Sequence, residues 1–136
     1  EIFVLNGDTY FVPELLKMEQ HHTVNSADAT IAVKQLADAS RYGRVVTNAS
    51  GYITGFMEKQ PEAGKGWING GIYLLKRSII ESIRELKFSL EHEVFRKLCT
   101  NFRMQAFRTD AFFLDIGIPA DLEKAQILIP AQNRVK

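Results

Sequence analysis

The sequence lacks several features that would assign it to a special class of protein. It has a single cysteine, Cys99, so neither a disulfide framework nor a thiolate zinc site can form within it. Its net charge is +1, which gives no electrostatic reason to bind nucleic acid or an anionic membrane. No apolar stretch approaches the length of a membrane-spanning helix. We therefore expect an ordinary globular domain, with no nucleic-acid or membrane partner, in the reducing cytoplasm.

Several common catalytic signatures are missing as well. Gly64-Lys65-Gly66 lacks the spacing of a phosphate-binding loop, and His92 has no second histidine four residues later. No serine occupies a nucleophile-elbow pattern. These absences argue against a P-loop nucleotidase, a helical zinc site and an α/β-hydrolase.

The chain begins abruptly. Residues 2–5 form an apolar run typical of a strand covered on both faces, and only Glu1 precedes it. The start also lacks the basic residues and cleavage site of a secretory signal. We expect further residues upstream of Glu1; the alternative is a small domain that begins with its first strand.

Apolar runs alternate with amphipathic segments along the chain. Strands are expected over residues 2–5, 29–36, 44–47, 52–56, 67–75, 104–107 and 112–116. Helices are expected over residues 13–19, 78–86 (capped by Ser78), from Ser89 through Leu98, and 119–129 (ended by Pro130). Residues 48–51 predict a hairpin turn with a glycine at positive φ. This order favours one α/β domain over residues 1–136.

Two aspartates lie where strands end. Asp8 follows the first strand within an Asn-Gly-Asp turn, and Asp115 ends the last strand. Ligands of α/β sheets bind outside the carboxyl ends of the strands, where a carboxylate can hold a hard cation. The alternatives are a plain solvent-facing turn for Asp8 and a helix cap or internal salt bridge for Asp115.

Two further segments carry candidate ligand-binding residues. Glu58-Lys59 follows a strand, where a lysine can grip a phosphate and a carboxylate can accept hydrogen bonds from sugar hydroxyls; the alternative is a surface ion pair. Asn69-Gly70-Gly71 interrupts an apolar run, which indicates a bulge or the close approach of a ligand. The alternative for this segment is a bulge with a packing role only.

In their order, these segments resemble the sugar-1-phosphate nucleotidyltransferase family. The resemblance rests on Val4-Leu5-Asn6-Gly7-Asp8, Tyr42-Gly43-Arg44-Val45, Phe56-Met57-Glu58-Lys59, Ile68-Asn69-Gly70-Gly71-Ile72-Tyr73, Ser89-Leu90-Glu91 and Phe113-Leu114-Asp115-Ile116-Gly117-Ile118-Pro119. It covers nearly the whole chain. Within the family, the chain looks most like the heptose-1-phosphate guanylyltransferases, with mannose- and glucose-1-phosphate enzymes close behind.

The resemblance implies a fold, a reaction and a set of site residues. The fold would be a Rossmann-like nucleotidyltransferase fold with a mixed, mostly parallel sheet, lacking its N-terminal portion. The reaction would join an NTP and a sugar 1-phosphate, with Mg²⁺, to give an NDP-sugar such as GDP-heptose and pyrophosphate. Asp8 and Asp115 match the metal carboxylates, and Lys59 matches the phosphate-binding lysine. Gly43, Glu58 and Asn69 match residues of the sugar pocket.

The chain also departs from the family. It has no Gly-rich triphosphate loop followed by Arg and Lys, so we expect this fragment alone to be inactive and to be marginal or to associate with itself. Gln60 separates Lys59 from Pro61, where many members run Lys-Pro directly, which predicts a differently shaped pocket loop. The alternative to an enzyme is a non-catalytic regulatory or assembly module that keeps the fold.

Overall fold

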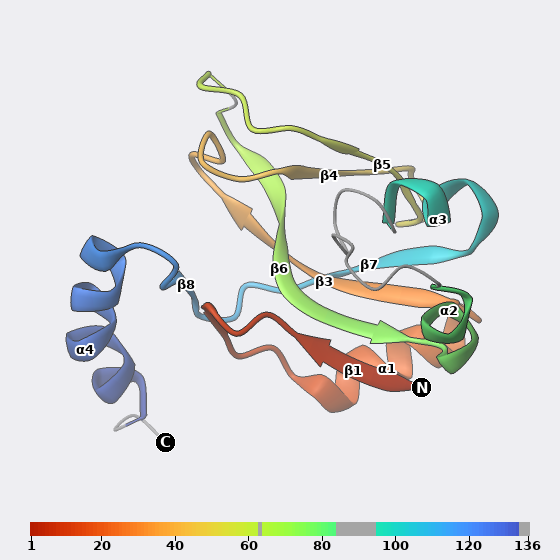
Figure 1. The fold of residues 1–136 in the computed structure, drawn as a ribbon, viewed down its shortest axis with the longest axis horizontal. Coiled ribbons are helices and arrows are strands. Elements are labelled where there is room, and N and C mark those ends of the chain that lie inside the picture. Colours follow the sequence, from red (N-terminus) through yellow and green to blue (C-terminus); the bar gives the residue numbers. More distant parts are fainter. Residues whose placement is uncertain (63, 84–94, 134–136) are drawn as a thin grey trace.

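The structure is a computed structural model that describes residues 1–62, 64–83 and 95–133. Its strands are β1 (Ile2–Leu5), β2 (Thr9–Phe11), β3 (Ala29–Leu36), β4 (Arg44–Thr47), β5 (Ile53–Met57), β6 (Gly66–Leu75), β7 (Met104–Arg108) and β8 (Phe113–Asp115). Its helices are α1 (Leu15–Val24), α2 (Arg77–Ser82), α3 (Arg96–Asn101) and α4 (Pro119–Asn133). Figure 1 shows their arrangement, which confirms the predicted α/β class.

The main sheet is organised around the long strand β6. Along one edge, β6 pairs with β3, which in turn pairs with β7. Along the other edge, the first half of β6 meets β4 at Ile68 and the second half pairs with β1. The result is a six-stranded sheet with the order β5-β4-β6-β3-β7 and with β1 beside β6 (Figure 1).

The sheet is mixed, as predicted, but the prediction that it is mostly parallel is wrong for the pairings that the structure describes. Only β3 and β7 run parallel, and the other pairs are antiparallel. Antiparallel neighbours can follow one another through tight turns, as β4 and β5 do. An apolar run indicates a strand but carries no information about its direction, so the sequence pattern could not decide this point.

The first strand is less covered than its apolar sequence predicted. Ile2 and Leu5 are 39% and 58% exposed, and β6 is the only described strand that pairs with β1. The strand itself is confirmed, whereas its burial on both faces is not, because β1 lies at an edge of the described sheet.

A bulge interrupts β6 at its two central glycines. The pairing register between β3 and β6 shifts between Ile31 and Val33, opposite Gly70 and Gly71. Gly71 has a φ of +74°, a backbone conformation that favours glycine. Gly70 is approached by the Phe11 ring, so closely that a β-carbon there would lie 2.5 Å from Phe11 Cδ1. The predicted bulge is therefore confirmed, and the group that approaches it is a side chain of β2.

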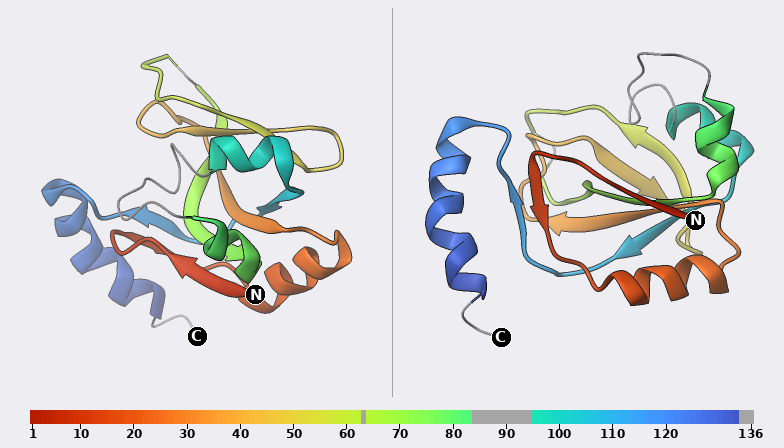
Figure 2. Two further views of the ribbon diagram at one scale, coloured as in Figure 1. Left: turned by 45° about the vertical axis from the view of Figure 1, so that its right-hand side comes forward. Right: turned by 60° about the horizontal axis from the view of Figure 1, so that its bottom comes forward.

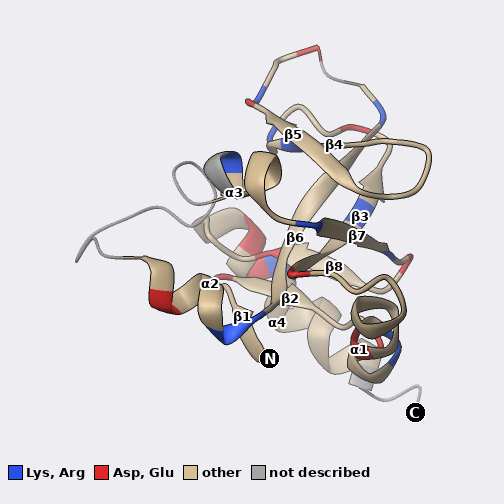
Figure 3. Ribbon diagram, turned by 90° about the vertical axis from the view of Figure 1, so that its right-hand side faces the viewer, with Lys and Arg blue, Asp and Glu red and all other residues tan. Residues whose placement is uncertain are grey.

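The two faces of the main sheet are covered by different elements. Side chains of β3 alternate: Ile31 and Val33 join the cluster that contains Ile79 of α2, whereas Ala32 joins the cluster that contains Met18 of α1. The right-hand view in Figure 2 and the view in Figure 3 show α1 on one side of the sheet and α2 and α3 on the other, which makes three layers. Within the described ranges, no helix has both the length and the apolar character needed to cross a membrane.

A second, two-stranded sheet pairs β2 with β8, with Thr9 opposite Asp115. It packs against the main sheet through Phe11, which is buried in one cluster with Ile72 and Leu74 of β6. The two short strands also contact each other through the rings of Phe11 and Phe113, which are 5.6 Å apart and edge to face. Because β2 follows the Asn-Gly-Asp turn directly and β8 ends at Asp115, this small sheet brings two distant chain segments to one place.

Several helix boundaries differ from the predictions. The helix expected over residues 13–19 is α1, which has Glu14 as its N-cap, begins at Leu15 and continues to Val24. Ser78 lies inside α2, whose N-cap is Lys76 with no side-chain cap, because the helix begins one residue earlier than the pattern predicted. Pro130 lies inside α4, which continues to Asn133. The fixed φ of proline is compatible with a helix, although Pro130 removes one backbone hydrogen bond and its ring crowds the carbonyl four residues earlier. The motif Ser89-Leu90-Glu91 and the end of the helix predicted over 78–86 lie outside the described residues.

Candidate functional site

The predicted site residues meet in one pocket with a volume of about 230 Å³. Its lining includes all of them: Asp8, Gly43, Glu58, Lys59, Asn69 and Asp115. Asn69 lies on β6 and Asp115 ends β8, whereas the other four come from the segments after β1, before β4 and after β5, so no single segment forms the pocket. The volume is close to the lower end of small-molecule sites, about 300 Å³, and suits a small polar ligand.

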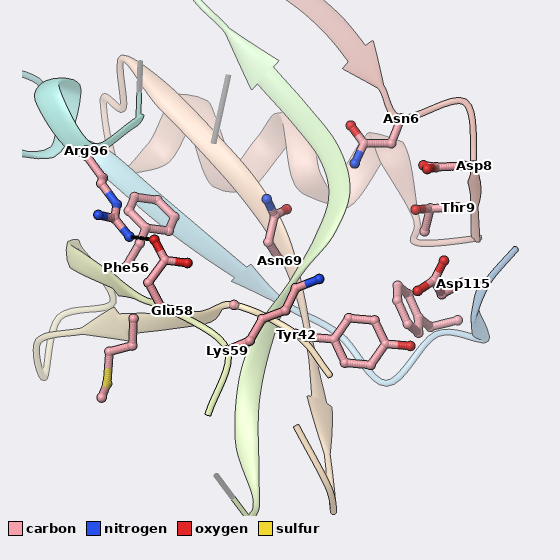
Figure 4. A pocket seen from close by; sticks show the side chains of 13 residues that line it. Asn6, Asp8, Thr9, Tyr42, Phe56, Glu58, Lys59, Asn69, Arg96 and Asp115 are labelled. Carbon is pink, nitrogen blue, oxygen red and sulfur yellow. Dashed lines mark hydrogen bonds and ion pairs between the residues drawn. The ribbon is translucent and has the colours of Figure 1, made fainter. Parts of the chain in front are cut away.

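The two aspartates face the same point in space. The β2–β8 pairing sets Asp8 beside the end of β8, and the backbone N–H of Ile116 donates to the Asp8 carbonyl at 2.9 Å. A β-carbon on Gly117 would lie 3.2 Å from Asp115 Oδ1 and 3.3 Å from Asp8 Oδ2. Glycine at position 117 therefore leaves room for both carboxylates, and Figure 4 shows Asp8 and Asp115 at the same end of the pocket.

The described contacts do not support the two alternatives for Asp115, a helix cap and an internal salt bridge. Asp8 is exposed in its turn, as its alternative requires, and it lines the same pocket as Asp115. The Asp115 carboxylate accepts the Gly117 backbone N–H at 2.9 Å, which is a local turn rather than the cap of α4. Among the described residues, neither aspartate has an ion-pair partner, and no three or more His, Cys, Asp or Glu side chains gather as a closed metal site. Two convergent carboxylates suit a Mg²⁺ ion that takes its remaining ligands from water and phosphate oxygens.

Tyr42 is a pocket residue that the sequence analysis did not single out. Its ring packs edge to face on Phe113 at 5.8 Å, and its hydroxyl points toward Asp115 (Figure 4). Burial first, and then the negative charge of Asp115, raise the pKa of the Tyr42 hydroxyl. Tyr42 therefore stays protonated at neutral pH. Its place beside Gly43 in the family motif is the signal that could have identified it.

Lys59 presents an available positive charge. Within the part of the chain that the structure covers, no hydrogen bond or ion pair ties its ammonium group to another residue. In Figure 4 the Lys59 amine projects into the pocket on the side of Asp115. A lysine that no carboxylate neutralises is a suitable partner for a phosphate.

Asn69 and Gly43 mainly determine the shape of the pocket. The Asn69 side chain accepts the Gly71 backbone N–H and donates to the Tyr73 hydroxyl, both at 2.9 Å. Its amide retains one further N–H for a ligand. A β-carbon on Gly43 would lie 3.4 Å from the Met57 carbonyl oxygen, so glycine there lets two strands close around the pocket.

Gln60 is anchored. Its side-chain oxygen accepts a hydrogen bond from the Arg44 guanidinium at 3.0 Å, across the hairpin of β4 and β5. The additional residue between Lys59 and Pro61 is thus tied to the strand that follows Gly43. This contact gives the pocket loop a defined shape.

A charged cluster joins the loop that carries Tyr42 to α4. Asp121 is 5% exposed and accepts hydrogen bonds from Arg41 at 2.7 Å and from Lys124 at 2.9 Å. Arg41 chiefly, and then Lys124, hold the pKa of the Asp121 carboxyl below its ordinary value. The cluster therefore connects one wall of the pocket to the segment that follows Asp115.

This cluster predicts a dependence of stability on pH. Because its folded pKa is depressed, Asp121 stabilises the fold fully above the unfolded pKa of about 3.9, and the effect is lost as the pH falls through the lower folded value. We expect Asp121→Asn to lower the midpoint of urea unfolding at pH 7. Below about pH 4 the difference between the midpoints of the variant and the wild type should shrink, because the Asp121 carboxylate becomes protonated. Glu123→Gln, an exposed carboxylate on the same helix, is the control and should leave the midpoint unchanged. A difference that stays constant from neutral to acid pH would contradict the prediction.

Comparison with known proteins places these residues in a family context. The model of a family described as nucleotidyl transferase matches residues 1–132. D-glycero-alpha-D-manno-heptose 1-phosphate guanylyltransferase of Aneurinibacillus thermoaerophilus is 41% identical over 127 residues, which are 92% of this chain and 54% of that protein. Probable mannose-1-phosphate guanylyltransferase 3 of Arabidopsis thaliana is 38% identical over 120 residues, 88% of this chain and 36% of that protein.

A solved structure agrees with the sequence matches. HddC from Yersinia pseudotuberculosis superposes with a TM-score of 0.80 at 35% identity, over 91% of this chain and 53% of that one. The chain thus spans about half the length of the heptose-phosphate relative and of HddC, and about a third of the plant protein. The predicted nucleotidyltransferase fold is confirmed for the part that the chain covers.

Proposed function

The chain belongs to the nucleotidyl transferase family, and we propose that it forms the sugar-phosphate side of an enzyme that makes a nucleotide-sugar. The substrates would be an NTP and a sugar 1-phosphate, and the products an NDP-sugar and pyrophosphate. The observation that carries the proposal is the convergence of Asp8, Lys59 and Asp115 in one pocket. The alternative of a non-catalytic module is disfavoured because these three charged groups are retained together.

The relatives support a narrower substrate class. The two sequence relatives reported above are named as guanylyltransferases of heptose or mannose 1-phosphates. We therefore propose GTP as the nucleotide and a manno-configured hexose or heptose 1-phosphate as the sugar, with GDP-heptose as the first product to test. The cytoplasm remains the predicted compartment, as the single cysteine suggested.

The chemistry is an in-line transfer. An oxygen of the sugar phosphate attacks the α-phosphorus of the NTP, the bond between the α-phosphorus and its bridging oxygen breaks, and pyrophosphate departs. The attacking oxygen is already anionic at neutral pH, so no general base is needed. The site has to bring two anions together and offset their charge. Lys59 would do this for the sugar phosphate through its ammonium group.

The carboxylate pair would hold the metal. Asp8 and Asp115 are the residues that would bind Mg²⁺, since their oxygens converge over Gly117. The ion would supply positive charge to phosphate oxygens. Tyr42 would orient Asp115 from the opposite side, because its protonated hydroxyl points toward that carboxylate.

The direct test is a product assay on the encoded protein together with any residues that precede Glu1, because residues 1–136 alone are expected to be inactive. The protein is incubated with Mg²⁺, each of the four NTPs and a panel of sugar 1-phosphates, and pyrophosphate and the nucleotide-sugar are measured. Formation of a GDP-sugar supports the proposal, and a different base or sugar would revise only the narrower substrate class. The absence of any nucleotide-sugar from every combination would overturn the proposal.

Lys59 gives a more specific prediction. We expect Lys59→Ala to raise the KM for the sugar 1-phosphate by about 10- to 100-fold, the range for losing a hydrogen bond to a charged group. The KM for the NTP should change little. Lys65→Ala removes the same charge from an exposed loop outside the pocket lining and should leave both constants near wild type. Equal effects of the two substitutions would contradict the role of Lys59.

A further inference from the structure

A second charged pair lies at the other end of the pocket. A terminal guanidinium nitrogen of Arg96, the first residue of α3, donates to Glu58 Oε1 in an ion pair that Figure 4 marks with a dashed line. Both residues line the pocket, and their side chains are 43% and 58% exposed. In the view of Figure 4, this pair and the Asp8–Asp115 pair lie on opposite sides of Lys59.

Aromatic packing beneath the pair determines its position. Phe95 is completely buried, and its ring stacks on Phe56 at 6.0 Å and contacts Tyr73 at 4.9 Å. Phe95 directly precedes Arg96, and Phe56 lies on β5, two residues before Glu58. The stacked rings therefore hold the two backbones that present the charged groups. An ion pair supported in this way is pre-organised, unlike one between two mobile surface chains.

The charges of the pocket are unevenly distributed as a result. At one end two carboxylates converge, and beside them Lys59 carries an uncompensated positive charge. At the other end the charge of Arg96 is matched by that of Glu58. A phosphate is favoured beside Lys59, whereas the Glu58–Arg96 end offers both donors and acceptors with no net charge.

We propose that Arg96 is a specificity-determining residue, which selects sugars that are uncharged at the end remote from the 1-phosphate. This inference rests on the proposed function and adds a residue and a selectivity to it. The Arg96 guanidinium holds Glu58 and has further N–H donors in a planar fork for sugar hydroxyls. The Glu58 carboxylate would repel a second anionic group on the sugar. Arg96 would not offset this repulsion, because its charge is already paired with that of Glu58. A lysine at position 96 would supply the same charge but not the planar set of N–H donors of a guanidinium group.

The inference predicts how substitutions change the preference of the protein between two ligands. Binding of mannose 1-phosphate and of mannose 1,6-bisphosphate is measured by calorimetry on the encoded protein together with any residues that precede Glu1. Wild type should prefer the monophosphate. Arg96→Gln should weaken monophosphate binding about tenfold, the lower end of the range for a charged hydrogen bond because the pair is half-exposed. Arg96→Lys should recover only part of this loss.

The charge argument is tested by the partner residue. Glu58→Gln leaves the Arg96 charge uncompensated, and the ratio of the two affinities should shift toward the bisphosphate by about tenfold or more, as for an added charged contact. The double substitution Glu58→Gln with Arg96→Gln should abolish that shift. Arg77→Gln breaks a similar Arg–Glu pair on α2, outside the pocket lining, and should leave the ratio unchanged.

The outcomes separate this inference from the proposed function. If wild type binds neither sugar phosphate, both are overturned. If wild type binds the monophosphate but the affinity ratio is the same in Glu58→Gln and in the double variant, Arg96 does not set specificity and only this inference fails. Thermal unfolding of each variant establishes that the measured protein is folded.

Discussion

Asp115→Asn should lower the turnover of nucleotide-sugar synthesis by about a hundredfold or more, the range for removing a key electrostatic group from an active site. The substitution is nearly isosteric, and the side-chain oxygen that accepts the Gly117 N–H is retained, so the local turn should persist. The change removes one negative charge from the point where the Asp8 and Asp115 oxygens converge. Asp8→Asn should have an effect of similar size for the same reason.

The control for this prediction is close by in the chain. Asp110 is 97% exposed, lies outside the pocket lining and pairs weakly with Lys34 at 3.8 Å. Asp110→Asn removes the same charge from the connection between β7 and β8, just before the strand that ends at Asp115. Its turnover should stay within about twofold of wild type, as for a surface substitution. Turnover of Asp115→Asn within a few-fold of wild type would refute the assignment of the carboxylate pair.

The double variant asks whether the two carboxylates act as one unit. If Asp8 and Asp115 hold one ion together, removing the second charge adds little once the first is gone, because residues that act together are not additive. We expect the double variant to be about as impaired as the worse single variant. Losses that multiply would mean that the two aspartates contribute independently. Turnover measured at increasing Mg²⁺ provides the second readout, since a weakened site should be partly rescued by more metal.

Gly70→Ala should destabilise the fold by about 1–3 kcal/mol, the usual cost of overpacking a core. An added β-carbon would lie 2.5 Å from Phe11 Cδ1 and 2.8 Å from the Ala32 carbonyl oxygen. The backbone oxygen cannot rotate away, and the Phe11 ring is buried against the sheet. Urea unfolding followed by circular dichroism measures the loss, and a midpoint equal to that of wild type would contradict the packing argument.

Another strand glycine provides a matched control. A β-carbon on Gly55 of β5 would have no atom within 4 Å, and its φ is not in the left-handed region. Gly55→Ala should therefore be neutral or stabilise the protein by up to about 1 kcal/mol, because alanine reduces the freedom of the unfolded chain. The contrast between two identical substitutions in one sheet isolates the contact with Phe11 from any general effect of alanine in a strand.

The steric clash caused by Gly70→Ala should also disturb the pocket that contains Asp8 and Asp115. Phe11 belongs to β2, which begins directly after Asp8 and pairs with the strand that ends at Asp115. A displaced Phe11 ring shifts β2, so we expect Gly70→Ala to lower turnover as well as stability. Phe11→Leu should relieve the clash, and the pair Gly70→Ala with Phe11→Leu should lose less stability than the sum of the single changes. Additive losses would show that the two positions are not coupled.

Local sequence patterns were sufficient for most of the strands. The apolar run over residues 29–36 matches β3 residue for residue, and the turn before Gly51 joins β4 to β5 as the hairpin pattern predicted. Gly51 has the positive φ that this turn requires. These features depend on neighbours within a few residues, and such local preferences are visible in the amino-acid order alone.

The site residues were predicted from motifs, but their convergence has a cause that no local pattern contains. Asp8 and Asp115 meet because β2 pairs with β8, and β2 is three residues long, too short for a periodic signal. Arg96 escaped notice for a similar reason. It is one arginine at the start of a short helix, and only the stacking of Phe95 on Phe56 brings it to Glu58.

The sequence by itself determined the α/β class, most strand positions, the bulge at Asn69-Gly70-Gly71 and the charged groups that the pocket needs. Only the tertiary structure decided the directions of the strands, the partner that approaches Gly70 and the pairing of Arg96 with Glu58. The difference is physical. Periodicity and turn chemistry act between residues that are close in the chain, whereas strand direction and pocket charge depend on segments that meet only after the chain has folded.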